Sequence, residues 1–373
     1  MKKICYVDED GRFGGPQQRM MLVASELCKL GIKIDFVIPT QEVEVFRKKL
    51  DEFKLNYFQL NINRLSLKPI FFFKYIFFFF YEIFMLASFF RKKKYDIIQA
   101  NSTPQFKAII ASIIIKKESV WVIEDSYFPA IIVKIFKFLA KFSKCKIIYT
   151  SNRVFDFYFK NNLNLKNFKK EIFAPVDQKK FSINNIYKIP NYINTKKITI
   201  TTVASLVPVK GIEYFIDAAD KLYAKNKNLD FIIAGPEINS QTKYSQIIKK
   251  KISGKDYIKY IGMIENVAEL LYSSHIFVCS SISEAGPITV YEAMTMKLPV
   301  VTTDVGACNQ IIKNNINGII VKNKSSNEIV LAVSKIINDE EFKLKLALNA
   351  YKFSKDFFSV KKIAKEYLQV YSI

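Results

Sequence analysis

Short apolar runs alternate with helix-like segments along the whole chain, and this alternation constrains the fold more than any other feature. Runs typical of buried strands recur at 4–7, 32–38, 97–100, 119–123, 146–150, 198–203, 231–234, 275–279 and 299–302. Between most of these runs, apolar residues recur with the spacing of an amphipathic helix. Strands that alternate with helices predict parallel sheets covered by helices on both faces, a doubly wound α/β architecture.

The 373 residues are enough for two such domains. A polar, turn-rich segment near 185–196 suggests the boundary, because asparagine and proline cluster there and the charge balance changes. We therefore predict an N-terminal domain over 1–190, a C-terminal domain over 191–356, and a last helix that covers residues 357–373.

The chain carries a formal net charge of +23, and most of the excess lies in its first half. Residues 1–200 hold 35 basic and 17 acidic residues, whereas residues 201–373 hold 22 and 17. This asymmetry predicts an anionic partner for the first half, a membrane surface or a nucleic acid. General drift toward lysine would explain part of the total but not the asymmetry. No pattern typical of an RNA-recognition, KH or zinc-finger domain is present, so we expect no nucleic-acid partner.

The cysteines and histidine exclude several kinds of site. The five cysteines are far apart and form no CxxC pair, so we expect reduced thiols in the cytoplasm. His275 is the only histidine, which nearly excludes a zinc site or a histidine-based triad, and we predict no metal ion and no cofactor. The apolar run at 4–7 ends at Asp8, too early for a signal peptide.

Residues 70–90 are almost entirely apolar and just long enough to span a bilayer. Lys74 and Glu82 interrupt this segment, and each would cost about 2.5–3.5 kcal/mol near the bilayer centre. On a helix both lie in one polar stripe with Tyr81 and Ser88. The stripe favours a helix half in protein and half at a lipid interface, over a buried helix or a spanning one.

Two basic features strengthen the membrane prediction. The basic run 91–94 follows the apolar segment directly, where it would meet anionic headgroups. Residues 131–146 place four lysines on one face of a predicted amphipathic helix: Lys134, Lys137, Lys141 and Lys144. A core helix with a solvated face is the alternative for this segment. We predict that 70–94 and 131–146 dock the first domain on an anionic membrane surface.

The segment 281–294 carries the strongest chemical signal. An apolar strand leads into a polar loop, and Pro287 then opens a helix at a first-turn position. Free backbone N–H groups at such a helix start form an anion site. Glu284 and Glu292 flank it and are suited to accept hydrogen bonds from sugar hydroxyls, although glutamates eight residues apart are common. Lys210, on a loop between a strand and a helix, would neutralise a diphosphate or is simply a surface lysine.

The order of these elements resembles the retaining glycosyltransferases of the GT-B fold, in particular glycosyltransferase family 4 (group 1). Residues 203–211, Val-Ala-Ser-Leu-Val-Pro-Val-Lys-Gly, resemble that family's V-G-R-L-x-P-x-K-G, and residues 284–292 resemble its E-x7-E signature. Further family elements resemble segments at 13–15, 172–181, 232–236, 260–262, 300–306, 317–318 and 357–371. The likeness covers nearly the whole chain.

This resemblance implies two Rossmann-like domains that face each other across a cleft, with the last helix crossing back to the first domain. It implies that Lys210 binds the donor diphosphate, that Glu284 contacts hydroxyls of the donor sugar, and that Glu292 holds the nucleotide ribose. Backbone groups would hold phosphate, and two glycines would let the N-terminal loop approach it: Gly286, Ile288 and Thr289, and Gly14 and Gly15.

The chain departs from the family pattern at two places. Ser205 stands at a donor-binding position where the family has an arginine for the diphosphate. The missing charge implies weaker catalysis, a different donor, or compensation by Arg12 or Arg19. Glu124 and Asp125 stand where the family has a histidine near the donor sugar. An acidic pair there would act as general base on an acceptor hydroxyl, or would signal lost activity.

The resemblance thus implies a metal-independent hexosyl- or N-acetylhexosaminyltransferase that acts with retention. It would move a sugar from a nucleotide diphosphate sugar to a glycan or lipid-linked acceptor in bacterial surface polysaccharide or lipopolysaccharide biosynthesis. We expect the protein to be cytoplasmic and peripheral on the inner leaflet of the plasma membrane. The alternative is a catalytically weak GT-B protein that binds a nucleotide sugar or assists a partner transferase.

Overall fold

The computed structural model describes residues 2–66, 68–160, 167–185 and 188–372. The chain divides into two units, one of Met1–Pro175 with Val360–Ile373 and one of Val176–Ser359. The sequence placed these divisions at 190 and 357. The earlier division arises because the Val176 N–H donates to the Phe358 carbonyl (3.0 Å) and Val176 pairs with Ser359, which ties the segment after Pro175 to the second unit.

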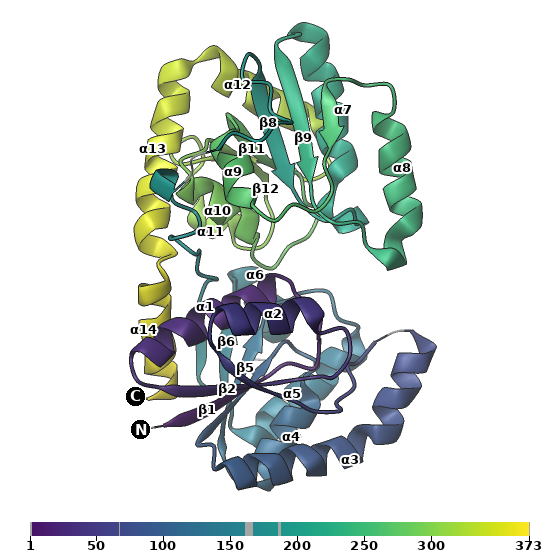
Figure 1. The fold of residues 1–373 in the computed structure, drawn as a ribbon, viewed down its shortest axis with the longest axis vertical. Coiled ribbons are helices and arrows are strands. Elements are labelled where there is room, and N and C mark those ends of the chain that lie inside the picture. Colours follow the sequence, from purple (N-terminus) through teal and green to yellow (C-terminus); the bar gives the residue numbers. More distant parts are fainter. Residues whose placement is uncertain (1, 67, 161–166, 186–187, 373) are drawn as a thin grey trace. The chain divides into compact units, whose positions relative to one another are not determined.

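The first unit contains a seven-stranded parallel sheet in the order β3-β2-β1-β4-β5-β6-β7 (Figure 1). Its strands are β1 (Lys3–Val7), β2 (Lys33–Ile38), β3 (Asn56–Gln59), β4 (Ile97–Asn101), β5 (Glu118–Ile123), β6 (Lys146–Tyr149) and β7 (Lys169–Glu171). The strands predicted in this half are confirmed, but β3 and β7 were not predicted. Both are short and largely polar edge strands, so they lack the apolar run that marks a buried strand.

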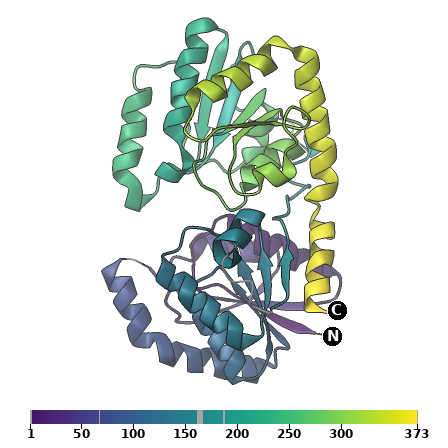
Figure 2. The same cartoon turned by 180° about the vertical axis from the view of Figure 1, so that it is seen from behind.

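Helices cover both faces of this sheet (Figures 1 and 2). On one face lie α1 (Gly15–Lys29), α2 (Glu44–Glu52) and α14 (Val360–Tyr371). On the other lie α3 (Pro69–Lys93), α4 (Phe106–Ile114) and α5 (Ala130–Ser143), and α6 (Asn152–Phe159) follows β6. The helix predicted over 131–146 ends earlier, at Ser143, because Lys144 adopts a left-handed conformation (φ 51°) that stops the helix before β6 begins.

The last helix, α14, belongs to the first unit. Its tyrosines reach the buried centre of the sheet. Tyr371 is fully buried, and its hydroxyl lies 2.6 Å from the Tyr6 hydroxyl and donates to Gln99 Oε1 (2.6 Å). The Lys146 ammonium donates to the Val370 carbonyl at the end of the helix (2.7 Å). These contacts attach the C-terminal segment to β1, β4 and β6 at once.

The second unit contains a six-stranded parallel sheet in the order β10-β9-β8-β11-β12-β13. Its strands are β8 (Ile198–Val203), β9 (Leu229–Ala234), β10 (Ile258–Tyr260), β11 (Ile276–Cys279), β12 (Val300–Thr303) and β13 (Ile319–Val321). Both sheets therefore have the strand order 3-2-1-4-5-6 of a Rossmann-like domain, and the first adds a seventh strand. The doubly wound α/β prediction is confirmed for each unit.

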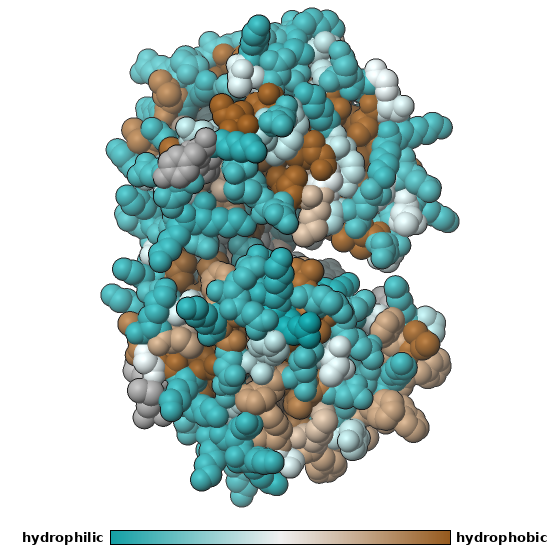
Figure 3. All heavy atoms as spheres, viewed as in Figure 1, coloured by the Kyte–Doolittle hydropathy of each residue, from teal (hydrophilic) through white to brown (hydrophobic). Residues whose placement is uncertain are grey.

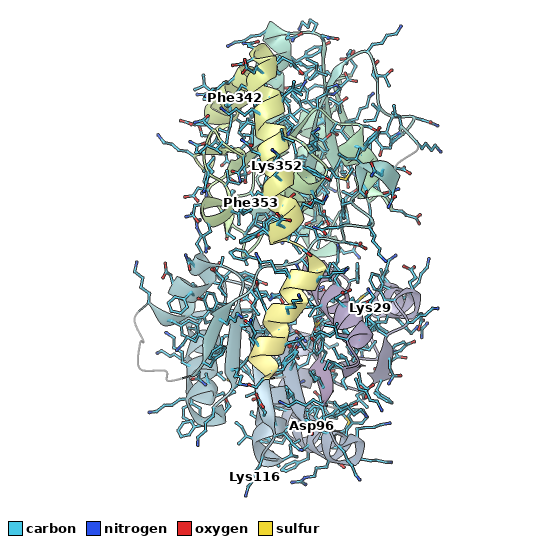
Figure 4. All side chains as sticks on the ribbon, turned by 90° about the vertical axis from the view of Figure 1, so that its left-hand side faces the viewer. Lys29, Asp96, Lys116, Phe342, Lys352 and Phe353 are labelled. Atoms are coloured by element: carbon cyan, nitrogen blue, oxygen red, sulfur yellow. The ribbon has the colours of Figure 1, made fainter. Side chains whose placement is uncertain are left out.

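The helices of the second unit also lie on both faces of its sheet. They are α7 (Ile212–Lys225), α8 (Thr242–Ile252), α9 (Val267–Tyr272), α10 (Ile288–Thr295), α11 (Cys308–Ile311), α12 (Ser326–Asn338) and α13 (Glu340–Phe357), with short 3-10 turns η1 (Ile183–Asn185), η2 (Pro208–Lys210) and η3 (Asn239–Gln241). Figure 4 shows Phe342 and Phe353 on α13. The ring of Phe353 stacks on that of Phe357 at 4.7 Å, near the point where α13 ends.

Removing the Tyr371 hydroxyl should destabilise the protein. Tyr371→Phe leaves Gln99 Oε1 and the Tyr6 hydroxyl without their shared partner in a dry core, which costs about 1–3 kcal/mol. Urea unfolding monitored by circular dichroism measures the difference. The control Tyr81→Phe removes an exposed hydroxyl and should change the free energy of unfolding by less than about 0.5 kcal/mol. Equal stability of both variants would contradict the structural role of Tyr371.

Candidate active site

Two loops meet at the carboxyl edge of the second sheet. The first covers 204–211 after β8, and the second covers 280–287 after β11. Because β8 and β11 are neighbours and the strand order reverses between them, these loops flank the switch point where ligands bind in such sheets. The Ile282 N–H donates to the Val209 carbonyl (2.7 Å), which fixes one loop to the other.

Glycines at two positions allow these loops to pack backbone against backbone. Gly211 has a φ of +57°, and a Cβ atom there would lie 2.3 Å from the Ser280 carbonyl oxygen. Gly306, after β12, has a φ of +52°, and a Cβ atom would lie 2.6 Å from the Ala285 carbonyl oxygen. Only glycine fits both the backbone conformation and the space. The two glycines therefore determine where the side chains on the loops are placed.

Lys210 and Glu284, both predicted from sequence, lie in direct contact. The Lys210 ammonium forms an ion pair with Glu284 Oε1, and the Ser281 hydroxyl donates to the same oxygen (2.8 Å). Burial opposes the charge on Lys210, but the attraction of Glu284 outweighs it and raises the pKa of Lys210. The lysine is therefore a permanent cation, and its charge is balanced by a carboxylate that a stronger anion can displace.

The helix beside this pair, α10, begins at Ile288. Pro287 is the N-cap and not the first helical residue, so the prediction for this proline is off by one position. Ile288 and Thr289, the predicted phosphate-binding positions, are the first two residues of α10 and are half-buried. Backbone N–H groups of such a first turn point out of the helix toward its start, where they favour an anion.

Glu292 lies on the second turn of the same helix and is 6% exposed. Gly286 precedes the helix, and a Cβ atom there would come within 3.1 Å of the Tyr291 hydroxyl. The Tyr291 ring stacks on Phe358 with centroids 4.2 Å apart, so α10 is held by the segment that follows α13. The second unit thus brings Lys210, Glu284 and the start of α10 to one edge of its sheet.

Ser205 lies in the second unit, whereas Arg12 and Arg19 lie in the first. Ser205 lies half-buried after β8, and its carbonyl accepts the Val207 N–H (2.9 Å). Arg19 is 1% exposed within the first unit, where its guanidinium forms an ion pair with Glu124 (3.0 Å). The guanidinium of Arg19 is thus buried and already paired within its own unit. Arg12 Nε donates to a carboxylate of its own loop, Asp10 (2.9 Å).

The acidic pair after β5 separates into two different roles. Glu124 is held by Arg19, whose guanidinium also donates to the Ile172 carbonyl (3.1 Å) and lies over the Tyr367 ring of α14. This carboxylate therefore anchors the sheet edge to the C-terminal helix. Asp125 forms no ion pair among the described residues, and of the predicted pair it is the better candidate for proton transfer.

Asp125 is buried beside polar side chains that the sequence did not reveal. The Tyr158 hydroxyl donates to its Oδ1 atom (2.6 Å), and Thr103 Oγ1 lies 3.5 Å from the same atom. Burial raises the pKa of Asp125 to about 7, against the opposing effect of these hydrogen bonds. A carboxyl group with this pKa exchanges a proton near neutral pH, as a general acid or base requires.

The predicted glycine loop leads from β1 into α1. Gly14 is the N-cap of α1 in an extended conformation, and Gly15 is its first residue. A Cβ atom on Gly14 would meet only ordinary contacts, the nearest with Gln17 Oε1 at 3.5 Å. The packing of this unit therefore does not demand a glycine at 14, in contrast to Gly211 in the second unit.

The histidine and cysteine side chains have structural roles in the fold. His275 Nδ1 accepts the Thr199 N–H (3.1 Å), which supports the parallel strands at the edge where β8 begins. The five cysteines are free thiols. Within the described ranges, no three His, Cys, Asp or Glu side chains gather in a group that could hold a metal ion.

The surface of α3 carries large apolar side chains exposed to solvent. Four phenylalanines at helical spacing are between 63% and 81% exposed: Phe73, Phe77, Phe80 and Phe84. Figure 3 shows this surface in brown tones over α3. By length and composition α3 is the one described helix capable of crossing a membrane, although most of its apolar stretch is not buried. The alternative of a buried core helix is therefore wrong.

Helix α5 adds to the same side of the first unit, since α4 lies between α3 and α5. Its exposed residues include Ile131, Phe138 and Phe142, with Lys134 and Lys141 among them. The predicted single basic face is thus a mixed face, apolar and basic. We call the exposed residues of α3 and α5 together the aromatic face.

Comparison with known proteins places this architecture among GT-B structures. HepE of Anabaena, solved with UDP and glucose, superimposes with a TM-score of 0.86 at 18% identity, over 100% of both chains. The likeness establishes the GT-B fold, in which each of two Rossmann-like units has its own parallel sheet. Residues 185–353, most of the second unit, match the family model described as glycosyl transferases group 1.

Curated relatives match over part of their length. An uncharacterized glycosyltransferase of Methanocaldococcus jannaschii is 31% identical over 176 residues, 47% of this chain and 44% of that protein. The N,N'-diacetylbacillosaminyl-diphospho-undecaprenol alpha-1,3-N-acetylgalactosaminyltransferase of Campylobacter jejuni is 28% identical over 176 residues, 47% of this chain and 45% of that enzyme. The chain thus spans about half the length of the curated relatives it matches.

Asp125→Asn should change how stability depends on pH. The folded-state pKa of about 7 lies above the ordinary value of 3.8, so this carboxyl contributes stability below about pH 4 that is lost as the pH rises to about 7. The variant lacks this titration. As the pH rises across that range, the free energy of unfolding of the variant should therefore increase relative to that of the wild type, by at most about 4 kcal/mol. Urea unfolding at a series of pH values tests this, and parallel curves would contradict it.

Proposed function

We propose that the protein is a metal-independent, retaining glycosyltransferase that uses a nucleotide diphosphate sugar as donor. The observation that carries the proposal is the Lys210–Glu284 ion pair at the start of α10. A cation and a helix start at one sheet edge suit a diphosphate, and Glu284 and Glu292 suit hydroxyls. The match of residues 185–353 to group 1 glycosyltransferases supports this reading.

The geometry suggests how the site would act. A donor diphosphate carries more charge than Glu284 and would take over the Lys210 ammonium, which releases the carboxylate to accept hydroxyls of the sugar. When the sugar leaves, negative charge grows on the diphosphate. Lys210 and the N–H groups at the start of α10 would stabilise that charge without rearranging, which is the usual source of rate enhancement in such sites.

Glu292→Ala should weaken donor binding while the fold stays intact. A lost hydrogen bond between ribose hydroxyls and a carboxylate corresponds to about 10- to 100-fold in affinity. Thermal-shift and calorimetric titrations with UDP-, GDP-, ADP- and dTDP-sugars identify the donor of the wild type and then compare the variants. Glu265→Ala, on an exposed loop of the same unit, is the matched control. Unchanged donor affinity in Glu292→Ala would remove the ribose assignment.

We further propose that the acceptor is a glycan or lipid-linked sugar and that the transferred group is a hexosyl or N-acetylhexosaminyl residue. The name of the Campylobacter relative, which acts on a diphospho-undecaprenol compound, supports a lipid-linked acceptor. Asp125, with its pKa near 7, would take the proton of the acceptor hydroxyl. Such chemistry belongs to bacterial surface polysaccharide or lipopolysaccharide biosynthesis.

A second candidate is a catalytically weak protein that binds a nucleotide sugar or assists a partner transferase. Two observations favour it: Ser205 leaves one cation fewer for the diphosphate, and Glu124 is committed to Arg19. Incubation with the donor and membrane extract separates the candidates. Transfer of labelled sugar supports the enzyme, whereas donor binding without transfer supports the weaker protein.

We propose that the aromatic face docks the protein on an anionic membrane surface, so that it is cytoplasmic and peripheral on the inner leaflet. Exposed phenylalanines are costly in water and favourable at a lipid interface, and Arg91, Lys92 and Lys94 lie exposed at the end of α3. A spanning α3 is disfavoured, because it connects β3 and β4 of one sheet. Basic residues next to exposed phenylalanines would thus favour lipid over nucleic acid as the anionic partner.

Replacing Arg91, Lys92, Lys93 and Lys94 by serine should release the protein from vesicles that contain phosphatidylglycerol. Each basic residue at an anionic surface contributes about 1 kcal/mol, so the loss of all four should weaken binding by about two to three orders of magnitude. Cosedimentation with vesicles measures the partition. The matched control replaces four lysines of the second unit, Lys243, Lys249, Lys250 and Lys251, and should bind like the wild type. Equal loss of vesicle binding in both variants would show that binding depends on the net charge of the protein and not on the position of residues 91–94.

A further inference from the structure

A buried lysine in the first unit contacts two carboxylates from different parts of the chain. Lys107, on α4, has no exposed surface. Its ammonium contacts Glu82 Oε2 on α3, and lies 3.3 Å from Glu9 Oε2 in the segment after β1. It also donates to the Asn63 carbonyl, in the segment before α3. One cation thus joins α3, α4 and the carboxyl end of β1.

On α3, both carboxylate oxygens of Glu82 have hydrogen-bond partners. Glu82 Oε2 accepts the backbone N–H of Asn63 (3.0 Å), and Glu82 Oε1 accepts its side-chain amide. The Lys107 ammonium also lies 4.4 Å from the centroid of the Tyr75 ring on α3. Lys107 is therefore bound tightly to the inner side of the helix whose outer side carries the exposed phenylalanines.

After β1, the carboxylate of Glu9 has partners among the described residues for only one of its two oxygens. Glu9 Oε1 is buried and has no hydrogen-bond partner in the described part of the chain. Burial raises the pKa of Glu9 to about 7, although Lys107 opposes this. The ammonium thus holds one carboxylate closely and the other at longer range, and a small displacement of α3 changes the weaker contact first.

Glu9 belongs to the loop 8–14, which runs from β1 to the N-cap of α1 at the carboxyl edge of the first sheet. Its neighbours are held separately. Asp8 accepts amide donors from Gln17 (2.8 Å) and Gln105 (3.1 Å), and Asp10 is bound by Arg12. Glu9 therefore attaches this loop to α4 and, through Lys107, to α3. Two further contacts hold the loop: the Asp8–Gln105 hydrogen bond at the N-cap of α4 and the Asp10–Arg64 ion pair (3.2 Å).

We propose that Lys107 is a positioning residue that joins the loop 8–14 to α3, so that contact of the aromatic face with lipid changes this loop at the carboxyl edge of the first sheet. Lys107 is too buried to touch a substrate and acts through Glu9. The inference rests on the proposed docking of α3 on lipid. It goes beyond docking, because it assigns the docked helix an effect on the edge of the sheet where Asp125 also lies.

Hydrogen exchange of the full chain, with and without vesicles of phosphatidylcholine and phosphatidylglycerol, tests this proposal. In the wild type, vesicles should slow exchange in peptides of α3 and change exchange in peptides that cover 8–14 by about threefold or more. Slowed exchange in α3 with an unchanged loop would overturn the coupling and leave the docking proposal standing. No change in α3 would overturn both.

Variants of Glu9 identify the residue that carries the effect. Glu9→Met removes the acceptor and leaves Lys107 paired one-to-one with Glu82, so the buried charges balance and the fold should persist. Its α3 should still respond to vesicles, whereas the loop response should disappear. Glu9→Gln keeps an acceptor oxygen and should retain about half of the loop response, because a neutral acceptor binds the ammonium less strongly.

The control Glu52→Met changes an exposed glutamate of α2 and should behave like the wild type. A full loop response in Glu9→Met would overturn the assignment to Lys107 and Glu9. Loss of the response in all three variants would show that it reflects general destabilisation, and would overturn the assignment as well.

Discussion

The candidate donor site depends on close backbone packing between the loops that follow β8, β11 and β12. Gly211 and Gly306 allow this packing, because side chains at either position would collide with neighbouring carbonyl oxygens. The packing brings the Lys210 ammonium against the Glu284 carboxylate beside the start of α10. Without it, the cation, the carboxylate and the helix start would each be an ordinary surface feature of an α/β unit.

The first unit distributes polar and apolar groups in an unusual way. Arg19 and Lys107 are buried and paired with carboxylates, while phenylalanines of α3 are exposed. Burying a charge is costly unless it is paired, and exposing an aromatic surface is costly in water. Paired charges remove the first cost within the protein. A lipid interface would remove the second, and this is the ground for the membrane docking that we propose.

Much of the architecture follows from local patterns in the sequence, and the exceptions have a common cause. The apolar runs predicted the buried strands, but the edge strand Lys169–Glu171 has no apolar residue and gives no such signal. Lys144 looked like part of a basic helical face, yet its left-handed backbone ends α5. The first exception depends on pairing with β6 and the second on the backbone conformation of one residue, and periodicity along the chain records neither.

The candidate site shows the same division. By itself the sequence determined the two Rossmann-like patterns and the motif residues Lys210, Glu284 and Glu292, since each motif is local and its spacing is tied to a strand, a turn and a helix. Only the tertiary structure decided which carboxylates already have a partner within the protein. Arg19 reaches Glu124 and Tyr158 reaches Asp125 from other elements of the first unit. Such partners meet through the packing of distant segments, so no pattern along the chain predicts them.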